Sequence, residues 1–183
     1  MPVKLLVIDV QNAVYTPALY AYDAFTANLT RLIESARRTG TEVIFIRHDD
    51  GAGEPLSPGN PGFEIAAPFS PLPGERVFDK QVNSPFRDSG LTEYLRRCGE
   101  NTLMITGLQT EYCVDAAVKC GFEHGFRIIV PAYANTTTDN THLTGEQSYH
   151  YYNAFSWNRR YAACIPTADA IAMMQPKGGR ACS

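Results

Sequence analysis

The sequence lacks the patterns that mark several common classes of protein. Its five cysteines are odd in number and include no CxxC pair, which argues against a disulfide scaffold or a zinc ribbon and favours reduced thiols in the cytoplasm. No apolar run is long enough to span a bilayer. Basic residues form no cluster larger than an adjacent pair in a chain of net charge −3, so neither nucleic acid nor a membrane is an expected partner. A GxGxxG motif and a P-loop are also absent, which argues against a nucleotide-binding protein.

Patterns typical of strands and helices alternate along the chain. The length of 183 residues suits one compact domain, so we predict a single domain over residues 1–183. The predicted strands are residues 3–10, 42–47, Arg76–Lys80, 103–106, 126–130 and 161–165. The predicted helices are residues 23–38, 91–98, a segment from Thr110, 145–157 and 167–174. This alternation predicts the α/β class, with a mostly parallel sheet covered by helices on both faces.

Two segments of the chain are predicted to be loops. Residues 48–75 are rich in proline and glycine with little periodicity, and a loop of this length in a compact domain is usually functional or a lid. Residues 134–144 are rich in Asn and Thr. Thr110 and Thr167 are predicted to cap the helices that begin near them. The tail from Pro176 is expected to fray.

Residues 102–121 bring a cysteine to a junction between a strand and a helix. The apolar run 103–106 leads to a turn at Thr110, after which helical spacing begins. Cys113 would then lie in the first helical turn, where unpaired backbone N–H groups and the helix dipole favour a thiolate. The alternative is that Cys113 is a small buried apolar residue, so its role depends on partners elsewhere in the chain.

Two further chemical groups stand at the ends of predicted strands. Asp9 ends the first strand, Lys80 ends the third, and Cys113 follows the fourth. Because chemistry in open α/β sheets collects beyond the carboxyl ends of the strands, we expect these side chains to share one site. Asp9 would accept the thiol proton, and Lys80 would favour the thiolate. The alternatives are an aspartate that caps a neighbouring turn and an edge lysine that reaches solvent.

Three blocks of sequence carry a resemblance to a known family. VIDVQN (7–12), FDKQVNSPF (78–86) and TGLQTEYCVDAAV (106–118) resemble, in order and spacing, the signature blocks of the isochorismatase-like cysteine hydrolases. That superfamily contains nicotinamidases, N-carbamoylsarcosine amidohydrolases and ureidoacrylate amidohydrolases. The resemblance implies a Rossmann-like three-layer sandwich with a six-stranded sheet and an Asp9–Lys80–Cys113 triad. It also implies a cis peptide between Leu108 and Gln109, so that the N–H groups of Gln109 and Cys113 form an oxyanion hole.

The reaction that the resemblance implies is hydrolysis of a C–N bond. The substrate would be a small amide, ureido or carbamoyl compound cleaved through a thioester, without a cofactor. The resembling proteins commonly form dimers or tetramers, so a homo-oligomer is expected. Two alternatives stay open: a vinyl-ether hydrolase of the isochorismatase type, whose members lack the cysteine, and a non-catalytic binding module on the same fold.

The end of the second predicted strand departs from the nicotinamidase pattern. Nicotinamidases carry a metal on an Asp-x-His pair with a further histidine nearby. Here His48 is followed directly by Asp49 and Asp50, with no other histidine before His124. Because adjacent residues of a strand point in opposite directions, we predict no metal site. His48 is instead predicted to line a pocket or anchor the loop, with a plain structural role as the alternative.

The predicted substrate contacts flank the triad blocks or lie in the long loop. They are Asn12, Tyr15, His48, Phe63, Asn83, Phe86 and Tyr112. For Phe63, fixing the loop is the favoured reading and lining the pocket the alternative. The sequence does not identify the amide, because specificity depends on the shape of the pocket and on few side chains.

Overall fold

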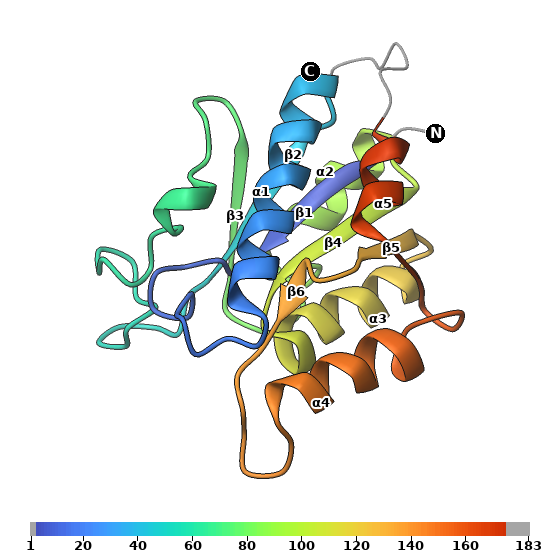
Figure 1. The fold of residues 1–183 in the computed structure, drawn as a ribbon. Coiled ribbons are helices and arrows are strands. Elements are labelled where there is room, and N and C mark those ends of the chain that lie inside the picture. The colour runs from blue at the N-terminus through green and yellow to red at the C-terminus, as the bar shows by residue number, and fades with distance from the viewer. Residues whose placement is uncertain (1–2, 175–183) are drawn as a thin grey trace.

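The computed structural model describes residues 3–174, in which one parallel sheet lies between two layers of helices (Figure 1). The order of the main strands is β3-β2-β1-β4-β5-β7, and the two-residue strand β6 pairs with β4. The strands are β1 (Lys4–Ile8), β2 (Val43–His48), β3 (Arg76–Lys80), β4 (Thr102–Leu108), β5 (Arg127–Pro131), β6 (Asn135–Thr136) and β7 (Ala162–Ile165). All of these strand pairs are parallel. The predicted α/β fold with helices on both faces of the sheet is confirmed.

The helices divide between two hydrophobic cores. They are α1 (Tyr22–Thr39), η1 (Ala67–Phe69), α2 (Leu91–Arg97), η2 (Thr110–Val114), α3 (Asp115–Glu123), α4 (Gly145–His150), η3 (Tyr151–Ser156) and α5 (Thr167–Met173). Leu5 and Val7 of β1 face α1 and α5, whereas Leu6 and Ile8 face α2 and α3. Because alternate residues of one strand enter opposite cores, β1 is apolar throughout and buried on both sides.

The sequence prediction was wrong at β6 and at two helix starts. Asn135 belongs to a strand rather than a loop, and its buried side chain is hydrogen-bonded to Thr110 Oγ1 at 2.9 Å and to Asn153. Thr110 therefore caps no helix, because its hydroxyl is used in this contact. The Thr167 hydroxyl likewise donates to the carbonyl of Ala132, at 2.5 Å. Polar side chains that bond to each other let an Asn- and Thr-rich segment enter the interior.

The remaining sequence predictions concern the redox state of the cysteines, the C-terminal tail, membrane-spanning helices, the cellular location and the oligomeric state. Cys113, Cys120 and Cys164 are free thiols, but the expectation of reduced thiols is wrong at Cys98, which takes part in a disulfide bond. The tail from Pro176 lies outside the described residues. Within residues 3–174, no helix is long and apolar enough to cross a membrane. The cytoplasmic location and the homo-oligomer stay predictions.

Candidate active site

The carboxyl edge of the sheet brings the three predicted catalytic residues together. Asp9 follows β1 directly and adopts a left-handed φ of 51°, while its N–H donates to the carbonyl of Ile46 on β2 at 2.9 Å. Aspartate is among the few residues other than glycine that occupy this region at modest cost. Lys80 is the last residue of β3. Cys113 lies in η2, a π-helical turn that continues directly into α3, so it belongs to the first turn of this helical segment, as predicted.

Gly107 brings β4 against β1 immediately beside this site. Gly107 pairs with Ile8 and has a φ of 118°. A Cβ atom at this position would lie 2.0 Å from the carbonyl oxygen of Ile8, so no residue with a side chain fits without moving one of the strands. The backbone that continues to Gln109 therefore runs next to Asp9. The Leu108–Gln109 peptide is cis, as the resemblance implied.

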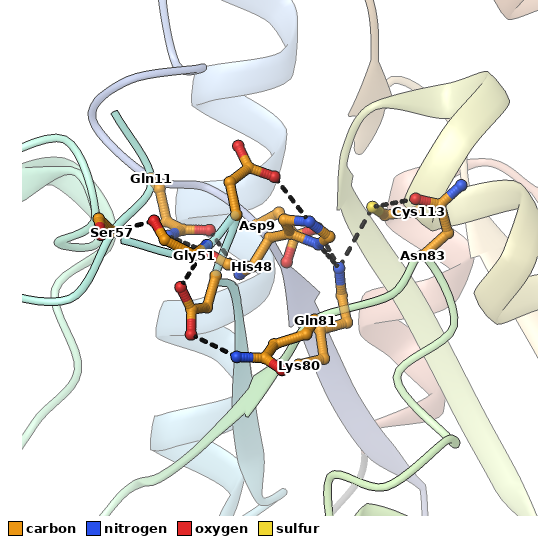
Figure 2. A network of polar contacts seen from close by, with 11 residues as sticks. Asp9, Gln11, His48, Gly51, Ser57, Lys80, Gln81, Asn83 and Cys113 are labelled. Atoms are coloured by element: carbon orange, nitrogen blue, oxygen red, sulfur yellow. Dashed lines mark hydrogen bonds and ion pairs between the residues drawn. The ribbon is translucent and has the colours of Figure 1, made fainter. Parts of the chain in front are cut away.

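Lys80 joins the acid and the thiol at the centre of a polar cluster (Figure 2). Its Nζ lies 2.7 Å from Asp9 Oδ2, 2.8 Å from His48 Nδ1 and 3.2 Å from Cys113 Sγ. An ammonium group has three N–H donors, so these contacts use all of them. The side chain of Lys80 is 0% exposed. These neighbours, rather than water, must therefore stabilise its charge.

His48 lies between Lys80 and a second carboxylate. Because an ammonium group only donates, His48 Nδ1 accepts from Lys80, and the ring proton belongs on Nε2, which is 2.9 Å from Asp50 Oδ1. Gln11 fixes the backbone of His48 from the end of β1. Its Oε1 accepts the His48 N–H at 2.7 Å, and its Nε2 donates to the His48 carbonyl at 3.0 Å. Backbone and ring contacts together therefore orient the imidazole toward Lys80.

Burial dominates the electrostatics of the acid and the thiol. It raises the pKa of Asp9 above the ordinary 3.8, although the Lys80 ammonium opposes the increase. Burial also raises the pKa of Cys113 to about 12; the Asp9 charge adds to this and Lys80 opposes it. Lys80 lowers the pKa of Cys113, which is the predicted direction, but burial and the Asp9 charge outweigh its effect. A base is therefore needed to remove the thiol proton when Cys113 reacts, which is the role predicted for Asp9.

The end of β2 does not fit a metal ion. The three side chains that surround Lys80 place their ligand atoms within 4.8 Å of one another, but the ammonium group bonds to each of them and takes the position of the cation. Asp49 uses its carboxylate to accept the N–H of Gly51 and the amide of Gln81, both at 2.9 Å. The side-chain atoms that could bind a metal ion therefore already form hydrogen bonds within the protein. That the protein needs no metal stays a prediction.

A pocket of about 130 Å³ opens beside the polar cluster. The residues that line it are Asp9, Val14, His48, Leu56, Asn83, Leu108, Gln109, Tyr112 and Cys113. Three of the predicted substrate contacts, His48, Asn83 and Tyr112, therefore lie at the pocket. Asn83 Oδ1 is 3.7 Å from Cys113 Sγ, and Tyr112 is 50% exposed. A ligand in the pocket would contact the acid, the thiol and both segments that follow β3 and β4.

Comparison with known proteins assigns the chain to a family. Residues 4–159 match the family model described as the isochorismatase domain, which is most of the chain. The chain belongs to the isochorismatase family. Its relatives include hydrolases that act on C–N bonds, as the name ureidoacrylate amidohydrolase indicates. The predicted membership of this hydrolase superfamily is thus confirmed.

Relatives and solved structures of the isochorismatase family extend the comparison. A streptothricin hydrolase of Streptomyces noursei is 34% identical over 137 residues, which cover 74% of this chain but only 50% of that protein, so this chain spans about half of its length. Ureidoacrylate amidohydrolase RutB of Methylobacterium radiotolerans is 27% identical over 80% of this chain and 69% of its own length. The crystal structure of an isochorismatase-family protein from Chromobacterium violaceum has a TM-score of 0.84 at 29% identity, covering 94% of this chain and 93% of the other.

Two of the predicted substrate contacts fasten the long loop instead. Asn12 does not line the pocket, because its side chain donates to the carbonyl of Pro61 at 2.9 Å and its N–H to the carbonyl of Glu64. Phe63 is also outside the lining; it is 2% exposed and lies under the guanidinium of Arg47. These contacts hold the second half of the long loop of this isochorismatase-family protein in place. This agrees with the role of fixing the loop that the sequence favoured for Phe63.

The other two contacts pack into the hydrophobic cores. Tyr15 is hydrogen-bonded to Thr26 of α1 at 2.7 Å, and its ring packs edge-on against Phe69. Phe86 stacks on Phe126 and is 7% exposed. Neither residue lines the pocket, so the structure does not bring them to the proposed site, and their contact with substrate stays a prediction. Tyr15 follows the first block and Phe86 ends the second block in the sequence, but both rings pack with the hydrophobic cores.

Sequence reasoning missed several residues of the site. Gln11 lies inside the block VIDVQN, two residues after Asp9, and this position close to the acid could have identified it as a site residue. Asp50 was visible as an acid close to His48, but the sequence could not say which of the two neighbouring aspartates the ring would meet. The apolar lining of Val14 and Leu56 comes from segments with no periodicity, and nothing in the sequence marked it.

Proposed function

We propose that this isochorismatase-family protein is a cysteine-dependent amidohydrolase, which cleaves the C–N bond of a small amide through a thioester. The observation that carries the proposal is the position of Lys80 Nζ, 2.7 Å from Asp9 Oδ2 and 3.2 Å from Cys113 Sγ, beside a pocket that both Asp9 and Cys113 line. An acid, a cation and a thiol in mutual contact at a pocket are the groups that acyl transfer requires. A binding module needs none of these three together.

Asp9 is the proposed base and acid of the reaction. Within the described part of the chain, its Oδ1 is buried and has no hydrogen-bond partner, while Oδ2 is held by Lys80. An unpaired buried oxygen is costly unless it has a role in the reaction. Oδ1 is therefore the proposed acceptor of the Cys113 proton as the sulfur attacks the carbonyl carbon. The same proton passes from Asp9 to the departing nitrogen, which leaves an acyl group on the sulfur.

The backbone beside Cys113 is the proposed site for the oxyanion. The N–H groups of Gln109 and Cys113, two residues that line the pocket, would donate to the negative oxygen of the tetrahedral intermediate. Lys80 keeps Asp9 ionised against the effect of burial and balances the charge that develops on the sulfur. Water activated by Asp9 then hydrolyses the thioester and releases the acid and the free thiol.

Release of ammonia tests the proposal directly. A panel of primary amides, ureas and carbamoyl amino acids, assayed with the wild-type protein, is expected to include a substrate. Cys113→Ala is expected to reduce its hydrolysis by at least roughly 10⁴-fold, since the nucleophile is lost. Cys120→Ser is the matched control, because Cys120 is a free thiol that does not line the pocket.

Two results would contradict the amidohydrolase. The first is an unchanged rate of ammonia release in Cys113→Ala. The second is the absence of ammonia from the whole panel, combined with formation of pyruvate from isochorismate, which would favour the vinyl-ether hydrolase. Intermediate trapping gives a further check: a wild-type protein quenched during turnover should carry the acyl group on Cys113, detected by mass spectrometry.

A further inference from the structure

Part of the lining of the pocket is an apolar wall. Val14, Leu56, Leu108 and the ring of Tyr112 line it. Leu56 is 8% exposed and Leu108 is fully buried, so their side chains form a dry surface, while half-exposed Tyr112 lies at the surface. A substrate that places its carbonyl at Cys113 puts the rest of its acyl part against this wall. Apolar groups gain free energy there, and charged groups lose their hydration.

The cations near the pocket are committed to other partners. All three N–H donors of Lys80 are used by the polar cluster, so Lys80 has none left for a charged substrate group. The Arg47 guanidinium bonds to Asp79 at 2.8 Å and lies 4.2 Å from the ring of Phe63. Among the lining residues of the described chain, none is Lys or Arg, and the one carboxylate, Asp9, already has its charge balanced by Lys80 through Oδ2. A substrate carboxylate would therefore be buried without an opposite charge, and a substrate ammonium would meet only a carboxylate that is already ion-paired.

The volume of the pocket limits the size of the group it encloses. At about 130 Å³ it lies below the range of roughly 300–1,000 Å³ that is usual for ligand sites. A protein cavity of about 150 Å³ lined by apolar side chains holds one benzene molecule. The enclosed part of the substrate therefore has about six non-hydrogen atoms, including the carbonyl group.

We infer that the substrate is an amide whose acyl part is compact, apolar and uncharged. The inference rests on the proposed amidohydrolase function and narrows it, because ureidoacrylate and carbamoyl amino acids carry a carboxylate that this pocket does not neutralise. The polar ends of Asn83 and Gln109 lie at the pocket and can pair with the amide group itself. The polar groups of the pocket thus bind the amide group, and the apolar wall binds the hydrocarbon part of the acyl group.

Three amides of similar size test the inference by turnover. Butyramide is uncharged, β-alaninamide replaces its terminal methyl group with an ammonium, and succinamate replaces it with a carboxylate. We expect kcat/KM for butyramide to exceed that for either charged amide by at least about 10-fold, because burial of an unpaired charge is strongly unfavourable. Equal or faster hydrolysis of a charged amide would overturn the inference while leaving the amidohydrolase intact.

Alkylation of Cys113 tests the inference without any hydrolysis. Iodoacetamide and iodoacetate both transfer a two-carbon group to the sulfur and release iodide, but only iodoacetate is charged. We expect Cys113 to prefer iodoacetamide by at least about 10-fold more than glutathione does, when each rate is followed by mass spectrometry. A ratio equal to that of glutathione, or lower, would overturn the inference even if no amide of the panel is hydrolysed.

Variants of the apolar wall identify the part of the pocket that is responsible. Leu56→Lys is expected to lower the preference for iodoacetamide over iodoacetate by about 10-fold, because it supplies the missing cation. Leu56→Met is the matched control and should keep the wild-type preference. Val14→Lys repeats the test from a different segment, in case the loop does not tolerate the first lysine. An unchanged preference in both lysine variants, with circular dichroism that matches the wild type, would contradict the inference.

Discussion

Two buried lysines lie at opposite ends of the sheet and have different partners. Lys4 begins β1 at the amino end of the strands; it forms an ion pair with Glu42 and lies 3.8 Å from Glu100. Lys80 ends β3 at the carboxyl end, where it contacts one carboxylate, a neutral imidazole and a thiol. The Lys4 side chain is 9% exposed and that of Lys80 is 0% exposed. Burial alone therefore does not distinguish the two.

The partners of the two lysines separate a structural role from a catalytic one. Lys4 is paired with two carboxylates and lies 5.7 Å from the ring centre of Tyr94, so its charge is balanced inside the fold. Two of the three partners of Lys80 are neutral, and one of them is the thiol at the pocket. A buried charge with fewer opposite charges is less stable, and such arrangements are found mainly where chemistry requires them. The partners of each lysine, more than its burial, therefore distinguish the structural Lys4 from Lys80, the proposed catalytic cation.

The largest expected effect is the loss of activity when only one of the two lysines is replaced. Lys80→Met should reduce kcat/KM by roughly 10³-fold or more, because neither the Asp9 carboxylate nor the developing thiolate then faces a cation. Lys4→Met should leave kcat/KM within about threefold of wild type, but lower the free energy of unfolding by about 3 kcal/mol, because Glu42 loses one of its cationic partners and the nearly buried Glu100 loses its ion pair. Enzyme assays measure kcat/KM, and urea unfolding measures the free energy of unfolding. Equal loss of activity in both variants would remove the distinction.

A smaller effect is expected on the reactivity of the thiol. The Asp9 charge contributes to the raised pKa of Cys113, so Asp9→Asn should speed alkylation of Cys113 at pH 8, by about 10-fold for each unit by which the pKa falls, although hydrolysis is lost. Glu42→Gln, on the Lys4 side, should leave the alkylation rate unchanged. Slower alkylation in Asp9→Asn would contradict the contribution of the Asp9 charge to the raised pKa of Cys113.

The pH profile of the wild type belongs to the same prediction. Asp9 must be ionised to accept the proton, and its pKa is raised, so kcat/KM should fall as the pH drops through a midpoint above 3.8. Alkylation of Cys113 should continue to rise with pH through the alkaline range, because the pKa of the thiol is about 12. An acid limb below 3.8 would exclude the buried carboxyl as the base.

The smallest effect is expected at Asp50, which reaches Lys80 only through His48. Asp50→Ala should lower kcat/KM by roughly threefold to tenfold, because the ring of His48 loses the acceptor that orients its Nε2. Asp50→Asn retains an acceptor oxygen and should recover most of the activity. Since the Asp50 side chain is 42% exposed, neither change should affect the unfolding midpoint measurably. Equal activity in Asn and Ala would mean that this contact does not orient the ring.

The position of the catalytic groups was predictable because parallel strands impose it. Asp9 and Lys80 follow strongly apolar or short β-prone runs, and such strands end at one edge of the sheet, so a shared site followed from the topology alone. The thiol was harder to describe. Its place after β4 could be read from the sequence, but its pKa could not, because burial among distant side chains decides it.

The lining of the pocket was only partly predictable, for a physical reason. Residues near a triad block were expected to contact substrate, yet Tyr15 and Phe86 turn into the cores, where aromatic rings gain more from burial. Leu56 belongs to a loop without periodicity, and hydrogen bonds from Gln11 to Phe63 and from Asn12 to Pro61 hold that loop against the end of β1. Neither side-chain direction nor such long-range contacts leave a local pattern in the sequence.

The hydrogen bonds that hold the long loop to Gln11 and Asn12 have a consequence for the rate of binding. A substrate meets a surface that is already shaped, so little free energy of association has to be spent on ordering protein segments. For the proposed amide substrates, selection would then depend on how well each amide fits this surface, with little rearrangement of the loop to slow the formation of the complex.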